Sequence, residues 1–302
     1  MFDICLLGTG GMVPLPYRYL TSLILRYNGT TILVDCGEGT QMPLQELRWG
    51  FKNINAVLFT HYHGDHITGL PGILYQMLNA ERTEKLILMG PKGISIIENM
   101  INVLFKNISF DIEFRELAEG EVLNIGDIVV KNAPVYHTIP CYGYSFEVKR
   151  LPVFDVEKAR KLHIPVKLWN ALQHGQVVQY DGCTYTPEMV WGKERKGLKV
   201  SYSTDTRPTE SLIDLIKESD LFIGEGMYGD DRDLEKAIEK CHSTFSETAR
   251  IAKEAKVTEL WLTHYSPSLV NPEKFIKNAT SIFHNTVVGK DLMTRSLKFS
   301  SQ

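Results

Sequence analysis

One loop constrains this chain more than any other stretch. Thr60-His61-Tyr62-His63-Gly64-Asp65-His66 places three imidazoles and a carboxylate directly after the apolar residues 56–59. That run is short and rich in aliphatic and aromatic side chains, so it predicts a buried strand, and residues 68–74 look helical. The loop therefore follows the carboxyl end of a strand, where α/β folds usually place their chemistry. Imidazole and carboxylate groups suit zinc, so the loop predicts a metal site.

Composition narrows the class of protein. The 302 residues are 43% hydrophobic and 23% charged, which is ordinary for a globular chain, and the net charge of −3 argues against a uniformly basic nucleic-acid binder. The first eight residues lack a signal-peptide pattern, and no apolar run reaches the roughly 18 residues that a membrane helix needs. The five cysteines form no C-x-x-C pair. We therefore expect a soluble, cytoplasmic protein with free thiols and no membrane partner.

Strand-like and helix-like segments alternate along the whole chain. The pattern predicts strands at residues 3–7, 22–27, 31–34, 56–59, 85–89, 128–132, 143–149, 198–202, 221–223, 260–263 and 295–299. It predicts helices at 93–104, 243–255 with Ser243 as N-cap, and 273–283. The Asn28-Gly29 hairpin demands antiparallel pairing, so a lone parallel sheet is disfavoured. We expect one α/β sandwich domain over residues 1–302, with the site along one edge.

Three further strand ends carry metal-type residues. His137, Asp205 and His264 each follow a predicted strand. With the loop, they make seven candidate ligands: His61, His63, Asp65, His66, His137, Asp205 and His264. Seven are too many for one four-coordinate zinc, but they suit two ions that share a carboxylate and activate a water between them.

In this order, the residues resemble the metallo-β-lactamase superfamily and, within it, the ribonuclease Z family of tRNA 3′-processing endonucleases. The similar segments are spread over nearly the whole chain: Leu6-Leu7-Gly8-Thr9-Gly10-Gly11, Asp35-Cys36-Gly37-Glu38, Thr60 to His66 with Gly69-Leu70-Pro71-Gly72, Gly90-Pro91-Lys92-Gly93, Tyr142-Gly143-Tyr144, Ser203 to Arg207, His242-Ser243-Thr244 and Leu262-Thr263-His264. The resemblance implies a four-layer αββα sandwich with a protruding basic arm.

The resemblance also implies how the ligands divide. One ion would be held by His61, His63 and His137 and the other by Asp65, His66 and His264, with Asp205 bridging them. The cofactor would be two Zn²⁺ per subunit, and Mn²⁺ or Fe²⁺ also suits such a mixed site.

Three residues receive catalytic roles from the resemblance. Asp65 would accept a proton from water, His242 would donate one to the leaving 3′-oxygen, and Glu225 would support His242. A plain helix-capping role for the segment around His242 remains an alternative. The chain departs from the family's usual His-Glu-Ala-Thr run, which here is Gly224-Glu225-Gly226-Met227.

A basic insert interrupts the second half of the chain. Residues 149–199 hold ten Lys or Arg and five Asp or Glu, a net charge of +5, so the rest of the chain carries −8. Such a segment suits a polyanion, and its Trp169, Tyr180, Tyr185 and Trp191 could stack on nucleotides or simply pack. The resemblance implies that residues 150–196 form a flexible arm that grips tRNA, and that the protein is a homodimer. The Gly-Pro pair usual in that arm is replaced near Val166-Lys167.

The sequence thus predicts a zinc-dependent endoribonuclease that removes 3′ trailers from precursor tRNA and leaves a 3′-hydroxyl. One alternative is a phosphodiesterase of the same fold that acts on cyclic nucleotides or other small diesters. Another is an RNA-binding module with structural metals. Around the site, we expect Asp35 to contact a ligand histidine, and Arg207 to contact either a phosphate or Asp205. His163, His174 and His284 are expected not to be ligands.

Overall fold

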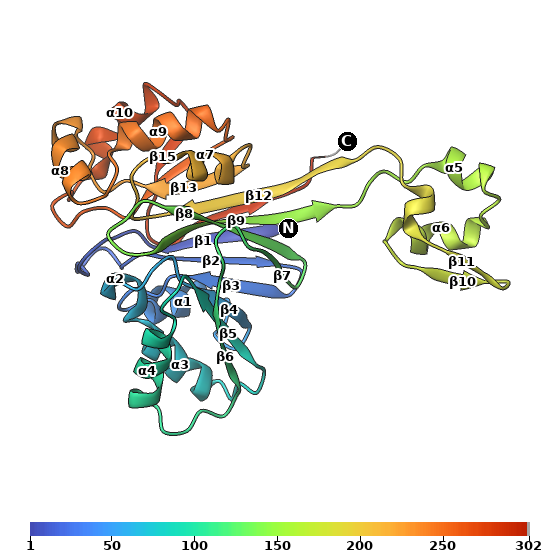
Figure 1. Ribbon diagram of the computed structural model, residues 1–302, viewed down its shortest axis with the longest axis horizontal. Coiled ribbons are helices and arrows are strands. Elements are labelled where there is room, and N and C mark those ends of the chain that lie inside the picture. The colour runs from blue at the N-terminus through green and yellow to red at the C-terminus, as the bar shows by residue number, and fades with distance from the viewer. Residues whose placement is uncertain (301–302) are drawn as a thin grey trace. The chain divides into compact units, whose positions relative to one another are not determined.

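The structure is a computed structural model that describes residues 1–300 (Figure 1). The chain forms two compact units. The first, called the body, comprises Met1–Glu147 and Lys199–Lys298. The second, called the arm, comprises Val148–Leu198 together with residues 299 and 300.

Two seven-stranded sheets build the body. The first runs in the order β16 (Met293–Leu297), β1 (Phe2–Gly8), β2 (Ser22–Tyr27), β3 (Thr30–Val34), β4 (Ile54–Leu58), β5 (Leu86–Gly90) and β6 (Ile112–Glu116). The second runs in the order β15 (Thr286–Val288), β14 (Leu260–Thr263), β13 (Leu221–Glu225), β12 (Arg195–Ser203), β9 (Cys141–Arg150), β8 (Ile128–Val135) and β7 (Val122–Ile125). Strands β3 to β6 are parallel, as are β12 to β15, while β1, β2 and β3 pair antiparallel. Each predicted strand overlaps one strand of these sheets, with ends that differ by a few residues.

Helices cover the outer face of each sheet, on opposite sides of the pair (Figure 1). Helices α1 (Gln41–Leu47), α3 (Leu70–Asn79) and α4 (Ser95–Leu104) pack on the first sheet, and α7 (Glu210–Ile216), α9 (Phe245–Glu254) and α10 (Ile276–Thr280) on the second. The short α2 (Gly64–Ile67) and α8 (Leu234–Glu239) lie in loops. Along β1, Cys5 and Leu7 join the helix-side core while Ile4 and Leu6 are buried on the other face. Because both faces are covered, the strands are nearly continuous apolar runs. The predicted αββα sandwich is confirmed.

Two local predictions were wrong. The helix expected at 273–283 is a 3₁₀ turn, η3 (Pro272–Phe275), followed by the five-residue α10. At their junction Phe275 has φ −107° and ψ 0°, outside the α-helical region, while its ring packs against the core of the second sheet. The N-cap of α9 is Thr244 rather than Ser243, because Thr244 and Glu247 form a reciprocal capping box.

The arm has a small core of its own. It contains α5 (Val156–Lys161), α6 (Val166–Gln173), β10 (Val178–Tyr180), β11 (Cys183–Tyr185) and the 3₁₀ turn η1 (Pro187–Val190). Trp169 and Tyr185 pack against the buried Ala159, Ile164, Leu168, Leu172 and Val190. Of the four aromatics for which stacking and packing were both open, these two therefore pack. Tyr180 is 39% exposed, and the Lys167 ammonium lies 3.7 Å from its ring centroid.

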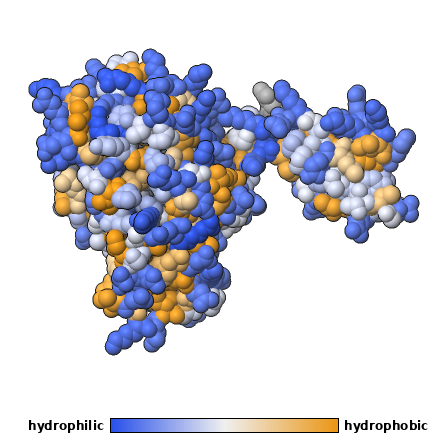
Figure 2. Space-filling model, in the orientation of Figure 1, coloured by the Kyte–Doolittle hydropathy of each residue, from blue (hydrophilic) through white to orange (hydrophobic). Residues whose placement is uncertain are grey.

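The surface is mainly hydrophilic in the view of Figure 2, with small separate hydrophobic patches on both units. None of the helices within residues 1–300 combines the length and the apolar character that a bilayer crossing needs.

Candidate metal centre

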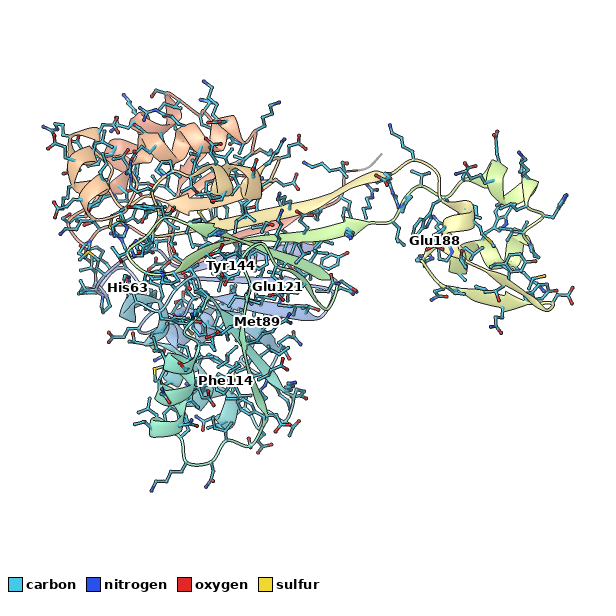
Figure 3. The ribbon with its side chains drawn as sticks, viewed as in Figure 1. His63, Met89, Phe114, Glu121, Tyr144 and Glu188 are labelled. Atoms are coloured by element: carbon cyan, nitrogen blue, oxygen red, sulfur yellow. The ribbon has the colours of Figure 1, made fainter. Side chains whose placement is uncertain are left out.

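The predicted ligands come together at one end of the body. His61 follows β4, His137 follows β8, Asp205 follows β12 and His264 follows β14. His63, beside α2, marks the place in Figure 3. Donor atoms from all seven predicted ligands fall into overlapping groups that are compact enough to hold metal ions. Loops from both sheets thus supply one cluster.

Three imidazoles form the first group. Nδ1 of His63 lies 3.0 Å from Nε2 of His61 and 3.2 Å from Nε2 of His137. Tetrahedral zinc with bonds of about 2.0–2.1 Å places its nitrogen ligands about 3.3 Å apart, so this spacing suits one ion. Burial lowers the pKa of all three imidazoles. They are therefore neutral, as metal ligands must be.

The second group joins a carboxylate to two imidazoles. Oδ2 of Asp65 lies 3.7 Å from Nε2 of His66 and 3.6 Å from Nε2 of His264. The backbone N–H of Met12 donates a 2.6 Å hydrogen bond to the same oxygen. Asp65 is thereby fixed from the loop after β1 as well as from its own helix.

Asp205 faces both groups. Its Oδ2 lies 3.0 Å from Nε2 of His66 and 3.1 Å from Nε2 of His264. Its Oδ1 lies 3.7 Å from Nε2 of His137 and 4.0 Å from Nε2 of His61. One carboxylate therefore turns one oxygen toward each group of ligands.

The donor set fits a divalent cation. Nε2 of His66, Nε2 of His264 and Oδ2 of Asp205 are buried and face one another, but within residues 1–300 none of them makes a hydrogen bond of good geometry. Buried polar atoms are rarely left unpaired, so these three point to a ligand at their centre. Burial opposes protonation of His264, yet Asp205 and Asp65 outweigh it and raise its pKa to about 10. The carboxylates thus favour positive charge at this position, which a bound divalent cation would supply in place of the proton.

A buried aspartate orients the ligand histidines, as expected for Asp35. Its Oδ2 lies 2.9 Å from Nδ1 of His66, which leaves Nε2 of that ring to face the site. The hydroxyl of Thr60 donates to the same oxygen at 2.9 Å and lies 3.0 Å from Nδ1 of His61. Asp35 thus fixes one ligand directly and another through Thr60, the arrangement common behind metal-bound imidazoles.

The backbone is strained at three of these positions, which the sequence did not reveal. Asp35, Asp205 and His264 have φ values of 58°, 39° and 61°, in the left-handed region. Each costs about 1–3 kcal/mol for a non-glycine residue, and such residues cluster at functional sites. All three lie within two residues of the end of a strand, where the turn into the loop aims the side chain at the cluster.

His242 and Glu225 are adjacent, as predicted. Nδ1 of His242 lies 2.6 Å from Oε1 of Glu225, whose Oε2 accepts a 2.5 Å hydrogen bond from the backbone of Ser243. Burial lowers the pKa of His242, but the Glu225 charge outweighs it and raises that pKa. A β-carbon at Gly226 would lie 2.8 Å from the ring of Phe245, so packing explains the glycine there. The unusual residues on either side of Glu225 therefore leave its contact with His242 intact.

Arg207 pairs with neighbours that sequence patterns did not single out. Both its terminal nitrogens bind the carboxylate of Glu247, the capping-box partner of Thr244 at the start of α9. One of them also donates to the carbonyl of His242 at 2.5 Å. Arg207 therefore secures the backbone of His242, and the contact expected with a phosphate stays a prediction.

A cavity of about 510 Å³ opens over the cluster. His63, Asp65, His137, Asp205 and His242 all line it. Its other walls are Met12, Thr138, Tyr228, Lys236, Lys240, Ser266, Pro267 and Ser268, which sequence patterns did not single out. His163, His174 and His284 are exposed and belong to none of the candidate metal groups in the described part of the chain, as expected.

Known proteins resemble the chain over its full length. A family model described as anti-Pycsar protein Apyc1 matches residues 2–286. Ribonuclease Z of Lachnospira eligens is 49% identical over 303 residues, covering 100% of both chains. Ribonuclease Z of Lachnoclostridium phytofermentans is 47% identical over 300 residues, covering 99% of both chains.

Solved structures confirm the fold. The short form of human tRNase Z superposes with a TM-score of 0.69 at 23% identity, covering 98% of this chain and 100% of that one. The metallo-β-lactamase fold protein YhfI from Bacillus subtilis gives 0.71 at 19% identity, covering 97% and 98%. The chain therefore belongs to the ribonuclease Z family of metal-dependent endoribonucleases with the metallo-β-lactamase fold.

Proposed function

We propose that this protein removes 3′ trailers from precursor tRNA, leaving a 3′-hydroxyl, with two divalent cations held by the seven clustered ligands. The observation that carries the proposal is the position of Asp205. Its two carboxylate oxygens face different ligand groups at 3.0–4.0 Å. A shared carboxylate is what two ions acting on one phosphodiester require.

The donor set divides into two metal sites. His61, His63 and His137 would hold one ion, and Asp65, His66 and His264 the other, with Asp205 between them. Zinc suits this mixture of imidazole and carboxylate, and Mn²⁺ or Fe²⁺ would also fit. When bound, the ions supply an activated water and stabilise negative charge on the phosphate.

Two side chains that line the cavity are placed to transfer protons. Asp65 lines the cavity, and His264 and His66 keep its carboxyl pKa well below its usual range although burial opposes this. It is therefore ionised and placed to accept a proton from the attacking water. His242 lies across the cluster, and Glu225 favours its protonated form. It is placed to protonate the departing 3′-oxygen.

Cleavage of a precursor tRNA tests this proposal. The wild-type protein should release the trailer and leave a 3′-hydroxyl, which mapping of the product's 3′ end will show. His63→Ala and Asp65→Ala should each abolish cleavage without unfolding the chain, checked by circular dichroism. If either variant cleaves at the wild-type rate, the assigned roles are wrong.

The arm is proposed to bind tRNA away from the cut. Its excess of basic residues and its separate core suit a module that contacts a polyanion. By resemblance to the family, the arm of one subunit would serve the active site of the other in a homodimer. The five unpaired cysteines support a cytoplasmic location.

Deletion of residues 155–190 tests the arm. The backbone N–H of Asp155 donates to the carbonyl of Val190 at 2.7 Å, so a short glycine-serine linker can close the gap. We expect kcat/KM for precursor tRNA to fall at least about a hundredfold, because the contacts with phosphates are lost. Turnover of bis-p-nitrophenyl phosphate, a single diester that offers no chain of phosphates for the arm to bind, should stay within about twofold. Unchanged cleavage of precursor tRNA would refute the assignment.

A second substrate class is small phosphodiesters such as cyclic nucleotides. The Apyc1 family model spans nearly the same residues as the ribonuclease Z relatives, and the run around Glu225 departs from the usual pattern. Side-by-side turnover of precursor tRNA and a cyclic nucleotide decides between the two substrates. A higher kcat/KM for the cyclic nucleotide would favour this alternative.

A further inference from the structure

A second cavity adjoins the metal centre on the far side of His137. Its volume is about 480 Å³, and His137 and Thr138 line both this cavity and the one over the cluster. Its remaining walls are Lys92, Glu119, Pro134, Val135, Tyr136, Ile139, Pro140, Cys141 and Tyr142. A substrate bound at the metal centre could therefore extend past His137 into this space.

Tyr136 is held rigidly at the edge of this cavity. Its backbone N–H donates to the hydroxyl of Thr206 at 3.2 Å, and its carbonyl accepts from the backbone of Arg207 at 3.0 Å. These bonds fasten the residue to the loop after β12, directly beside Asp205. The side chain itself is 60% exposed. The backbone of Tyr136 is thus fixed next to the reacting centre, and its aromatic ring is left accessible.

The chemistry of the walls indicates an uncharged, flat occupant. Val135, Ile139 and Pro140 give apolar surface, while Lys92 and Glu119 bring opposite charges. A site built for a phosphate alone would show an excess of positive charge instead. Exposed aromatic rings beside a phosphodiester site stack on unpaired nucleobases.

We propose that Tyr136 stacks on the base of the first nucleotide after the cut, the first nucleotide of the trailer. This assignment rests on the proposed function. His242 lines the cavity over the cluster and would protonate the 3′-oxygen of the upstream nucleotide, so that nucleoside occupies the cavity of His242. The other nucleoside attached to the scissile phosphate then passes His137 into the second cavity.

Substrates with and without that base test the assignment. Two precursor tRNAs are identical except that the first trailer nucleotide carries uracil or is abasic. With the uracil substrate, Tyr136→Ala should lower kcat/KM about tenfold, which lies within the range that stacking of one base on an aromatic ring contributes. Tyr136→Phe keeps the ring, so its kcat/KM with the uracil substrate should stay within about twofold of the wild-type value. With the abasic substrate, kcat/KM of the wild type should be about tenfold lower than with the uracil substrate. Tyr136→Ala should then have the same kcat/KM as the wild type.

Controls separate stacking from structural damage. Alanine leaves the backbone bonds of Tyr136 in place, so the metal content of Tyr136→Ala should equal that of wild type. Tyr75→Ala removes another exposed tyrosine, on α3, and should cleave both substrates as wild type does.

Three results would overturn the assignment. An equal loss on both substrates would give Tyr136 a structural role. If cleavage depended on the base upstream of the cut rather than on the first trailer base, the ring would lie on the other side of the cut. If the wild type cleaves both precursors and Tyr136→Ala cleaves them at the same rate, only the Tyr136 subsite is refuted. If the wild type cleaves neither precursor, the proposed function is refuted as well.

Discussion

Replacing Asp205 by asparagine is expected to lower kcat for precursor-tRNA cleavage at least about a thousandfold while the chain stays folded. The carboxylate turns one oxygen to each group of ligands, and an amide offers only one weaker acceptor and an NH₂. Losing the shared ligand removes about 4 kcal/mol or more of charge stabilisation in the transition state, which corresponds to that factor. Asparagine is the suitable substitute because it tolerates the φ of 39° at this position.

Metal analysis identifies the cause of such a loss. Asp205→Asn should retain fewer ions per chain than wild type after dialysis, and its far-ultraviolet circular dichroism should be unchanged. Asp214→Asn, a surface substitution on α7, removes the same charge outside the cluster and should retain both activity and metal. If Asp205→Asn kept two ions and full activity, Asp205 would not be the bridging ligand.

Removing the imidazole of His242 is expected to lower kcat by about a hundredfold to ten-thousandfold, the usual contribution of a general acid. KM should change little, because the assigned role concerns the departing oxygen rather than substrate binding. Single-turnover rates with precursor tRNA measure the effect on the chemical step. A substrate with a sulfur in place of the departing oxygen needs less protonation, so His242→Ala should impair it less. Equal impairment of both substrates would argue against proton donation.

The pH profile of Glu225→Gln checks the same assignment. In the wild type the Glu225 charge outweighs burial and raises the pKa of His242. A general acid works when protonated, so activity is lost as the pH rises through that pKa. Glutamine removes the charge and lowers the pKa of His242, so the basic limb of the kcat profile should move to lower pH. An unmoved basic limb would show that His242 is not the acid.

Sequence patterns were sufficient to predict the candidate ligands that lie next to strand ends. Residues such as His137 and His264 follow short apolar runs, and parallel strands in one sheet bring their carboxyl ends together. The loop from His61 to His66 supplies four donors within one turn, so its convergence needed no long-range information. Resemblance to a known family then divided the donors into two groups.

Other features depend on contacts between distant segments. The pairing of Arg207 with Glu247 joins the loop after β12 to the start of α9, forty positions away, and no periodicity reveals it. The left-handed turn at Asp205 depends on packing, since aspartate tolerates this backbone region without requiring it. The break at Phe275 has the same origin, because the ring is held in the core of the second sheet.

The cap of α9 also determines how activity is lost on heating. Glu247 closes the first turn of α9 through Thr244 and binds Arg207, which in turn holds the carbonyl of His242. Fraying of that single turn would release His242 from its place while both sheets remain folded, because helix ends open at lower cost than central strands. Thermal inactivation would then precede global melting, and restoring the temperature would restore activity without any refolding of the body.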